Sequence, residues 1–214
     1  MKLALIGATG FVGKAVLNEA LQRGYDVTAI ARDPKKVETA SDKLTLKAAD
    51  VLDTESLAVA LKGHDAVVSA YNAGWTNPNL YDDFVKGSEA IQQAVKQAGV
   101  KRLLVVGGAG SLYAAPGLQL VDSPQFPAEW KAGATGARDY LNTLKKETEL
   151  DWTFLSPAIN LHPGKRTGKF RLGTEEPVFN EKGVHEISVE DLAVAILDEL
   201  ENNQFVKRRF TVGY

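Results

Sequence analysis

The sequence predicts an α/β protein built on a doubly wound parallel sheet, with a small lobe near its C-terminal end. Two observations carry this prediction. Short apolar runs of strand length alternate with helical patterns along the 214 residues, and a glycine-rich turn at residues 7–13 joins the first strand to the first helix. Such alternation is typical of parallel sheets with helices on both faces. We expect one domain over residues 1–214, with residues 157–187 forming part of the lobe.

The glycine-rich turn follows the apolar strand Leu3–Ile6 and opens an amphipathic helix. Gly7 can take the backbone angles of a sharp turn, Gly10 leaves the backbone open to a pyrophosphate, and Gly13 lets the helix pack close to the strand. Free N–H groups at the helix start favour an anion. This context predicts a Rossmann-type dinucleotide site. A β-to-α turn without a nucleotide is the alternative.

Strands are expected where a short apolar run rich in β-branched residues is bounded by turn residues. After the first strand, such runs cover 25–31, 44–48, 66–70, 102–106, 152–155 and 210–212. Helices are expected where apolar residues recur at helical spacing between a capping residue and a stop signal. The first helix ends at Gly24, and the next is capped by Asp53. Further helices cover 80–98, 127–148 and 189–201, the last capped by Ser188.

Two stretches fit neither pattern. The segment after residues 107–111 reads as a loop of roughly 15 residues, a length typical of functional loops, and it carries the prolines Pro116, Pro124 and Pro127. Residues 159–187 are polar and contain glycines, which predicts short strands and loops. Ligands of doubly wound sheets bind at the carboxyl ends of the strands, where strand order reverses. We therefore expect the loops after the strands to surround one cleft.

The residue after the second strand indicates which dinucleotide binds. A carboxylate at this place would bond the ribose 2′-hydroxyl of NAD, whereas this chain has Arg32, with Lys35 and Lys36 nearby. A basic side chain suits the 2′-phosphate of NADP. We therefore favour NADP(H), while Asp33 keeps NAD(H) open if its side chain turns inward. A solvated surface arginine is the alternative without a ligand.

Further cofactor contacts are expected from the loops after later strands. Asp50 is expected to accept a hydrogen bond from the adenine amine, and Val51 to cover the adenine ring. The alternative is that Asp50 only caps a turn. Ala70 and Tyr71 are expected beside the ribose and nicotinamide, although Tyr71 also suits a packed loop aromatic. The full set of predicted cofactor-binding residues is Gly7, Thr9, Gly10, Phe11, Val12, Arg32, Asp50, Val51, Ala70, Tyr71, Pro157 and Ala158.

Ser111 is the candidate catalytic residue, because it ends the glycine run after the fifth strand. A hydroxyl there can bond a substrate oxygen or the nicotinamide amide, and a purely structural role is the equal alternative. Tyr113 is a second candidate. The chain has no Gly-x-Ser-x-Gly and no histidine pair at metal-ligand spacing, so we predict neither a serine hydrolase nor a metal site. The tryptophans Trp75, Trp130 and Trp152 are expected to pack in the core or lobe.

Composition argues against several other classes. The chain has no cysteine, which removes disulfides, thiolate metal sites and cysteine nucleophiles. A formal net charge of −2 gives no basic signature for nucleic acid or an anionic membrane. The opening apolar run is short and broken by Gly7, so it reads as a strand rather than a signal peptide. We expect a cytoplasmic monomer or homodimer whose partner is a small-molecule acceptor.

With these residues in place, the chain resembles the atypical short-chain dehydrogenase/reductases. Within them it is similar to the NAD(P)H-flavin reductase group, which is related to biliverdin reductase B and the nitrogen-metabolite-repression regulators. The resemblance covers nearly the whole chain. It is carried by five motifs, namely residues 7–13 (GATGFVG), 31–34 (ARDP), 107–112 (GGAGSL), 151–158 (DWTFLSPA) and 187–193 (ISVEDLA). The first motif is specific to the superfamily and the later ones narrow the group.

One departure from the superfamily pattern bears on chemistry. Typical members carry Tyr-x-x-x-Lys on the helix after the fifth strand, where the lysine lies one turn from the tyrosine and lowers its pKa. Here Tyr140 is followed four places later by Leu144, and Lys145 is rotated to another face of the helix. A tyrosine-dependent carbonyl reductase is therefore disfavoured.

The resemblance implies an NAD(P)H-dependent enzyme that reduces free flavin or a quinone-like acceptor by hydride transfer, with the flavin as a substrate rather than a tightly bound group. Hydride transfer between two planar rings needs no tyrosine–lysine pair. The alternative is a non-catalytic NADP(H)-binding redox sensor that regulates a protein partner. An epimerase or dehydratase acting on a sugar nucleotide is disfavoured, because the segment 157–187 is small for such a substrate.

Overall fold

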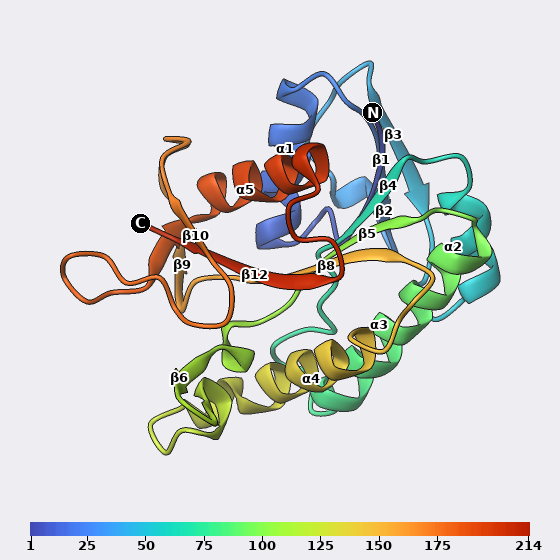
Figure 1. Ribbon diagram of the computed structural model, residues 1–214. Helices are drawn as coiled ribbons and strands as arrows, with labels where there is room; N and C mark the ends of the chain where they lie inside the picture. Colours follow the sequence, from blue (N-terminus) through green and yellow to red (C-terminus); the bar gives the residue numbers. More distant parts are fainter.

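The computed structural model describes residues 1–214 and has an eight-stranded sheet at its centre (Figure 1). Strand order is β10-β12-β8-β5-β4-β1-β2-β3, and all neighbours are parallel except β10, which runs antiparallel to β12. The strands are β1 (Lys2–Ile6), β2 (Asp26–Ala31), β3 (Leu44–Ala48), β4 (Ala66–Ser69), β5 (Arg102–Val106), β8 (Asp151–Ser156), β10 (Arg171–Gly173) and β12 (Arg208–Gly213).

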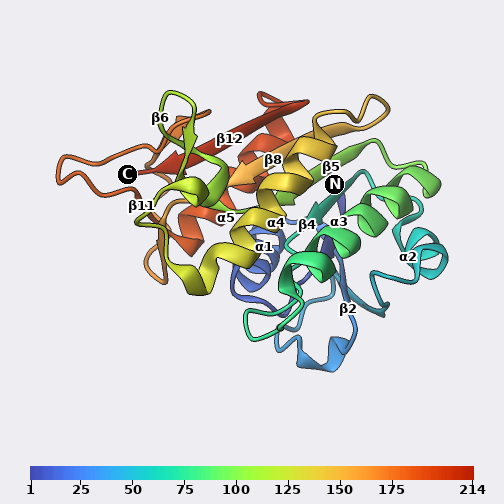
Figure 2. The same cartoon turned by 90° about the horizontal axis from the view of Figure 1, so that it is seen from below.

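Helices cover both faces of this sheet (Figures 1 and 2). One face carries α1 (Phe11–Gln22) and α5 (Val189–Asn202), and the other carries α2 (Thr54–Leu61), α3 (Leu80–Gln97) and α4 (Ala128–Leu144). The side chains of β1 alternate between the two cores, since Leu3 and Leu5 face α1 while Ala4 and Ile6 face α3. The predicted doubly wound α/β fold is confirmed. No helix combines the length and apolar character needed to cross a membrane.

Local chemistry explains where the helices begin. The carboxylate of Asp53 accepts a hydrogen bond from the backbone N–H of Ser56 at 3.1 Å, and the hydroxyl of Ser188 accepts from that of Asp191 at 3.1 Å. Both side chains satisfy N–H groups that have no partner inside the helix. The two predicted caps are therefore present. The first helix stops at Gly24, whose φ of +77° suits glycine.

Two segments differ from the sequence prediction. The long loop after β5 contains a small hairpin, β6 (Tyr113–Ala115) and β7 (Leu118–Gln119), turned at Gly117 with φ +77°. Helix α4 ends at Leu144 rather than near residue 148. The carboxylate of Glu147 accepts from the backbone N–H of Glu149 at 2.6 Å, so the chain forms a turn at this point instead of a further helical turn.

Residues 159–187 form short strands and loops, as predicted. β9 (Asn160–His162) pairs in parallel with β11 (Glu186–Ser188), and β10 adds to the edge of the main sheet. The loop between β9 and β10 crosses back over α1 and α5. The backbone N–H groups of Thr167 and Gly168 donate to the Asp191 carboxylate at 2.7 and 2.8 Å, which anchors this loop on the first turn of α5.

A buried ion pair joins the end of α5 to the sheet. The guanidinium of Arg102 lies 2.7 Å from the carboxylate of Glu199 and also donates to Thr153 Oγ1 at 2.9 Å. The same carboxylate accepts from the backbone N–H of Phe205 at 3.0 Å. Because both charges are removed from water, each depends on the other for compensation.

We expect Arg102→Met to lower the free energy of unfolding by about 3 kcal/mol, because it leaves the Glu199 carboxylate buried without a cation. Chemical denaturation measures the change. Arg208→Met, at an exposed position of β12, is the matched control and should shift the free energy of unfolding by less than about 0.5 kcal/mol. Equal losses for both variants would contradict this account.

Candidate functional site

A cavity of about 170 Å³ lies at the carboxyl edge of the sheet, where β1 has β2 on one side and β4 on the other. Strand order reverses at this place, which is where doubly wound sheets bind their ligands. Seven of the predicted cofactor-binding residues line it, namely Gly7, Thr9, Gly10, Arg32, Val51, Ala70 and Tyr71. The structure therefore brings together residues from four separate loops of the chain.

The three glycines of the turn differ in what surrounds them. Gly7 has φ +83°, and a Cβ there would lie 2.5 Å from the carbonyl oxygen of Ala70. A Cβ at Gly13 would lie 2.0 Å from the carbonyl oxygen of Gly7. At Gly10 the nearest atom to an added Cβ is 3.4 Å away, so the fold itself tolerates a methyl group there. Gly7 and Gly13 are therefore required by packing, and Gly10 is not.

The open backbone at Gly10 fits a phosphate group. Gly10 is the N-cap of α1, and no side chain caps this helix. Its first-turn N–H groups point toward the carboxyl edge of the sheet without a partner from the helix. Backbone N–H groups and the positive end of a helix dipole are suited to an anion. The residues present thus match the pyrophosphate of a dinucleotide.

Arg32 lies at the end of β2 on the wall of the cavity. Its side chain is exposed and forms no ion pair or hydrogen bond with the rest of the chain. By contrast, the carboxylate of Asp33 accepts from the backbone N–H of Lys35 at 3.3 Å and caps the short turn Pro34–Lys36. Of the two side chains weighed for the ribose, Arg32 is free to meet a ligand and Asp33 is occupied by the turn.

Tyr71 packs as a loop aromatic and also lines the cavity, while its contact with a cofactor stays a prediction. Its ring packs on Phe84 of α3, with ring centroids 6.1 Å apart, and its hydroxyl donates to the carbonyl oxygen of Asp83 at 3.1 Å. The same side chain forms part of the cavity wall. Burial raises the pKa of Tyr71, so the phenol stays protonated. Asp50 accepts from the backbone N–H of Leu52 at 3.0 Å and thus holds the turn in which Val51 faces the cavity.

Besides Asp50, four other predicted cofactor contacts do not line this cavity. Phe11 is 49% exposed on the opposite flank of the first turn of α1, and Val12 packs against the core beneath that turn. Pro157 and Ala158 follow the carboxyl end of β8, and Ala158 is buried in the core between the sheet and the α1–α5 layer. Their contact with the nicotinamide half of a cofactor stays a prediction.

Ser111 lies inside the protein, where it is 1% exposed. Its hydroxyl is 3.2 Å from Ser156 Oγ and accepts from the guanidinium of Arg209 at 3.0 Å. Arg209 also pairs with Glu175 and lies over the ring of Tyr113, 5.8 Å from its centroid. The structural alternative for Ser111 is therefore favoured, and a catalytic role stays a prediction. The role of Arg209 could not be predicted from the sequence, because β12 is buried on both faces and shows no alternation that marks an inward arginine.

The helix after β5 carries no acid/base pair. Tyr140 is fully enclosed in the core between α3, α4 and the sheet, and its hydroxyl has no hydrogen-bond partner. Burial raises the pKa of Tyr140, which opposes ionisation. Lys145 is the C-cap of α4 and lies beyond the last turn. The spacing of Tyr140 and Lys145 predicts that they do not form a tyrosine–lysine pair, and the positions of the two side chains agree with this.

The tryptophans divide into two groups. Trp152 is buried in the core, in line with the predicted core or lobe packing, whereas Trp75 and Trp130 are 63% and 50% exposed and do not belong to the core. Trp75 lies against α4, because an added Cβ at Gly133 would be 3.1 Å from its ring. Both exposed indoles therefore lie beside the N-terminal half of α4.

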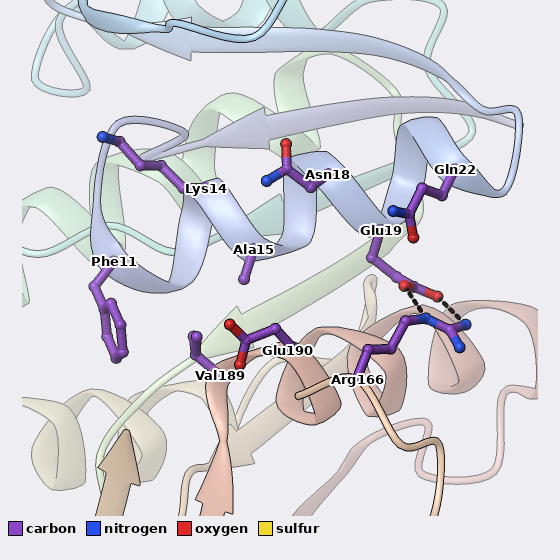
Figure 3. Close-up of a pocket in the computed structure, with 9 residues that line it drawn as sticks. All are labelled: Phe11, Lys14, Ala15, Asn18, Glu19, Gln22, Arg166, Val189 and Glu190. Carbon is purple, nitrogen blue, oxygen red and sulfur yellow. Dashed lines mark hydrogen bonds and ion pairs between the residues drawn. The ribbon is translucent and has the colours of Figure 1, made fainter. Parts of the chain in front are cut away.

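A second, larger cavity of about 340 Å³ is a groove along the outer face of α1 (Figure 3). It lies between that helix, the loop after β9 and the first turn of α5. Its floor includes Glu19, whose carboxylate is bound to Arg166 by two hydrogen bonds of 2.6 and 2.8 Å and to Arg23 at 2.8 Å. The lining residues are Phe11, Lys14, Ala15, Asn18, Glu19, Gln22, Arg166, Val189 and Glu190.

Comparison with known proteins gives a consistent result. A sequence model of the NAD(P)H-binding family matches residues 7–203. The protein YwnB of Bacillus subtilis is 41% identical over 99% of this chain and 98% of its own. Rice cinnamoyl-CoA reductase 1 is 33% identical over 122 residues, which are 53% of this chain and 36% of that enzyme. The chain thus spans about a third of the length of that curated relative.

Solved structures extend the likeness to the whole fold. A candidate epimerase from Bacteroides thetaiotaomicron has 47% identity and a TM-score of 0.93, covering 100% of this chain and 96% of that one. A candidate NADH-flavin reductase from Streptococcus pneumoniae TIGR4 has 39% identity and a TM-score of 0.87, covering 100% and 99%. Both likenesses span the whole of this chain, from the glycine turn to the last strand.

The glycine turn yields a prediction that separates binding from folding. Gly10→Ala should keep the thermal unfolding midpoint of the parent, because its surroundings accept a methyl group. It should weaken NADPH binding by about tenfold or more, because the methyl group occupies the path of the pyrophosphate. Gly13→Ala should instead cost about 1–3 kcal/mol of folding free energy or more through overpacking.

Calorimetric titration with NADPH and thermal unfolding of both variants provide the measurement. NADPH affinity in Gly10→Ala equal to that of the parent would show that the phosphates do not approach the backbone at this residue.

Proposed function

The chain belongs to the NAD(P)H-binding family, and we propose that it is an NAD(P)H-dependent reductase of free flavin or a quinone-like acceptor. One observation carries the proposal: a cavity at the strand-order reversal, lined by the glycine turn and Arg32, is combined with a helix α4 that holds no tyrosine–lysine pair. Carbonyl and alcohol chemistry needs a proton donor at the reacting oxygen. A planar acceptor that exchanges protons with water does not need one.

The bound nicotinamide would supply the hydride. The protein's part is then to bind, orient and exclude water, which brings two planar rings into contact without further groups. The glycine turn holds the phosphates, and Val51 and Ala49 cover the adenine side of the cavity. Tyr71, fixed by Phe84 and Asp83, forms a rigid wall. Pro157, Ala158 and the lobe formed by residues 157–187 bound the acceptor side.

A relative supports the choice of acceptor. The Streptococcus pneumoniae structure, at 39% identity over the whole chain, is described as a candidate NADH-flavin reductase. The Bacteroides thetaiotaomicron structure is described as a candidate epimerase. The enclosed Tyr140 and the short C-terminal lobe favour the flavin assignment over sugar-nucleotide chemistry.

The free side chain of Arg32 supports NADP(H) over NAD(H). A guanidinium can bind a phosphate through two parallel hydrogen bonds, and no carboxylate of the chain competes for this one. Lys35 and Lys36, on the turn that follows, add positive charge near the same place. The 2′-phosphate of the adenosine ribose is the group these residues suit.

Purified protein supplied with NADPH should reduce riboflavin, FMN or a quinone of a standard panel, as followed by NADPH absorbance at 340 nm in a general reductase assay. Tyr140→Phe should keep the rate within about twofold, because the hydroxyl is enclosed and takes no part in proton transfer. A reduction rate that falls 100-fold or more in Tyr140→Phe would instead indicate a tyrosine-dependent mechanism. Tight NADPH binding without reduction of any acceptor would contradict the proposed reductase activity and favour a non-catalytic redox sensor.

Arg32→Ala should weaken NADPH binding about 10- to 100-fold, because a charge-assisted hydrogen-bond pair is lost, and it should leave NADH binding within about twofold. Titration of each variant with both dinucleotides measures the ratio. Lys62→Ala, an exposed lysine at the end of α2 and outside the cavity lining, is the control and should leave the ratio unchanged. An unchanged ratio in Arg32→Ala would show that this arginine does not contact the 2′-phosphate.

A further inference from the structure

The groove along α1 begins at the carboxyl edge of the sheet. Helices α1 and α5 pack against each other on one face of the sheet (Figure 1), and α1 starts just beyond the carboxyl end of β1. At their starts, Phe11 and Val189 form the apolar end of the groove (Figure 3). The groove then follows α1 to Gln22, a distance of about 16 Å at the helical rise. It is therefore an elongated site with one end at the proposed reaction centre.

The groove continues where the dinucleotide cavity stops. Gly10 lines the cavity, and Phe11, the next residue, lines the groove. The cavity takes the adenosine side of the cofactor, because Arg32 and Val51 belong to it. In doubly wound sheets the other half of the dinucleotide crosses to the far side of the strand-order reversal. The Phe11 end of the groove thus adjoins the space in which an acceptor ring must lie.

The charged groups of the groove cancel one another. Arg166 is paired with the buried Glu19 at 2.6 Å, and Lys14 lies 3.6 Å from Glu38. Glu190 accepts from the backbone N–H of Gly164 at 2.8 Å. The groove lining holds two cations and two carboxylates and has no net charge. It therefore offers no selective attraction to a phosphate or an ammonium group.

Two amide side chains in the groove have free hydrogen-bonding capacity. The side-chain amide of Gln22 forms no hydrogen bond with the chain. The side-chain amide of Asn18 uses only its oxygen, which accepts from Thr39 Oγ1 at 3.3 Å. Each amide offers two N–H donors and a carbonyl acceptor. Hydroxyl groups satisfy such amides, whereas an isoprenoid chain would remove them from water without replacing their hydrogen bonds.

The opposite wall of the groove is held in place before any ligand arrives. Arg166 donates two hydrogen bonds to the Glu19 carboxylate, and the backbone N–H groups of Thr167 and Gly168 donate to the buried Asp191 carboxylate. The Thr167 hydroxyl donates to the same carboxylate at 2.5 Å. A preformed wall reduces the ordering cost of binding a flexible chain.

We propose that this groove binds the uncharged, hydroxylated side chain of a flavin, with the isoalloxazine at the Phe11 end and the ribityl chain along Asn18 and Gln22. The inference rests on the proposed function and sharpens it, because it selects ribityl flavins over quinones with apolar tails. It also assigns the terminal phosphate of FMN no role.

Three flavins with the same ring test the assignment. Lumiflavin has no ribityl chain, riboflavin has the chain, and FMN adds a phosphate. In steady-state assays with saturating NADPH, riboflavin should show a KM about five- to tenfold below that of lumiflavin, the effect of one or two neutral hydrogen bonds. FMN should match riboflavin within about threefold, because the groove carries no net charge.

The variant Asn18→Ala/Gln22→Ala should raise the KM for riboflavin to that for lumiflavin and leave the KM for lumiflavin unchanged. Both sites are exposed on α1, and alanine is favourable in a helix, so the fold is preserved. Gln93→Ala, an exposed amide on α3, is the matched control and should change neither constant.

The possible failures are distinguishable. Equal KM values for lumiflavin and riboflavin in the parent protein would overturn the groove assignment and leave the proposed reductase intact. A KM for FMN tenfold or more below that for riboflavin would overturn it as well, because a phosphate would then be recognised. Absence of turnover with all three flavins would overturn both this inference and the flavin branch of the proposed function.

Discussion

The approach of the first turn of α1 to the end of β1 is the contact on which the rest of this structure depends. A Cβ at Gly13 would lie 2.0 Å from the carbonyl oxygen of Gly7, so only a bare backbone allows it. That approach sets the direction of α1, and its N–H groups then face the carboxyl edge of the sheet. It also determines what lies on either flank of the turn, namely the cavity at the strand-order reversal beside Gly10 and the groove beyond Phe11.

Buried carboxylates hold the C-terminal part of the chain against this frame. Glu19 binds Arg23 and Arg166, and Asp191 binds Thr167, Gly168 and the Tyr214 hydroxyl. For Glu19, the hydrogen bond from Arg166 is the main cause that lowers its pKa. For Asp191, burial opposes ionisation, but its several donors together lower the pKa. Each carboxylate thus stays charged, and its hydrogen bonds hold together segments that are far apart in sequence.

The features predicted from sequence are those encoded locally. A few neighbouring residues are enough to indicate the glycine turn, the caps at Asp53 and Ser188 and the place of Arg32 after β2. The fold could then be predicted from the order of strands and helices along the chain. Contacts between distant segments could not be predicted in this way. The hydroxyl of Ser111 is enclosed because Arg209 reaches it from the last strand. The groove exists because Arg166, in a polar loop without helical period, binds Glu19 on the first helix.

The packing of α1 against α5 also has a consequence for how the protein is made. The face of α1 that carries Val16, Leu17 and Ala20 is covered by α5 and the strands beneath it. During synthesis, α1 leaves the ribosome before residues 189–202 do. Until then, the glycine turn is attached to a helix with an uncovered apolar face. Exposed apolar surface makes partly synthesised chains prone to aggregation, and this face of α1 is covered only once α5 has been made.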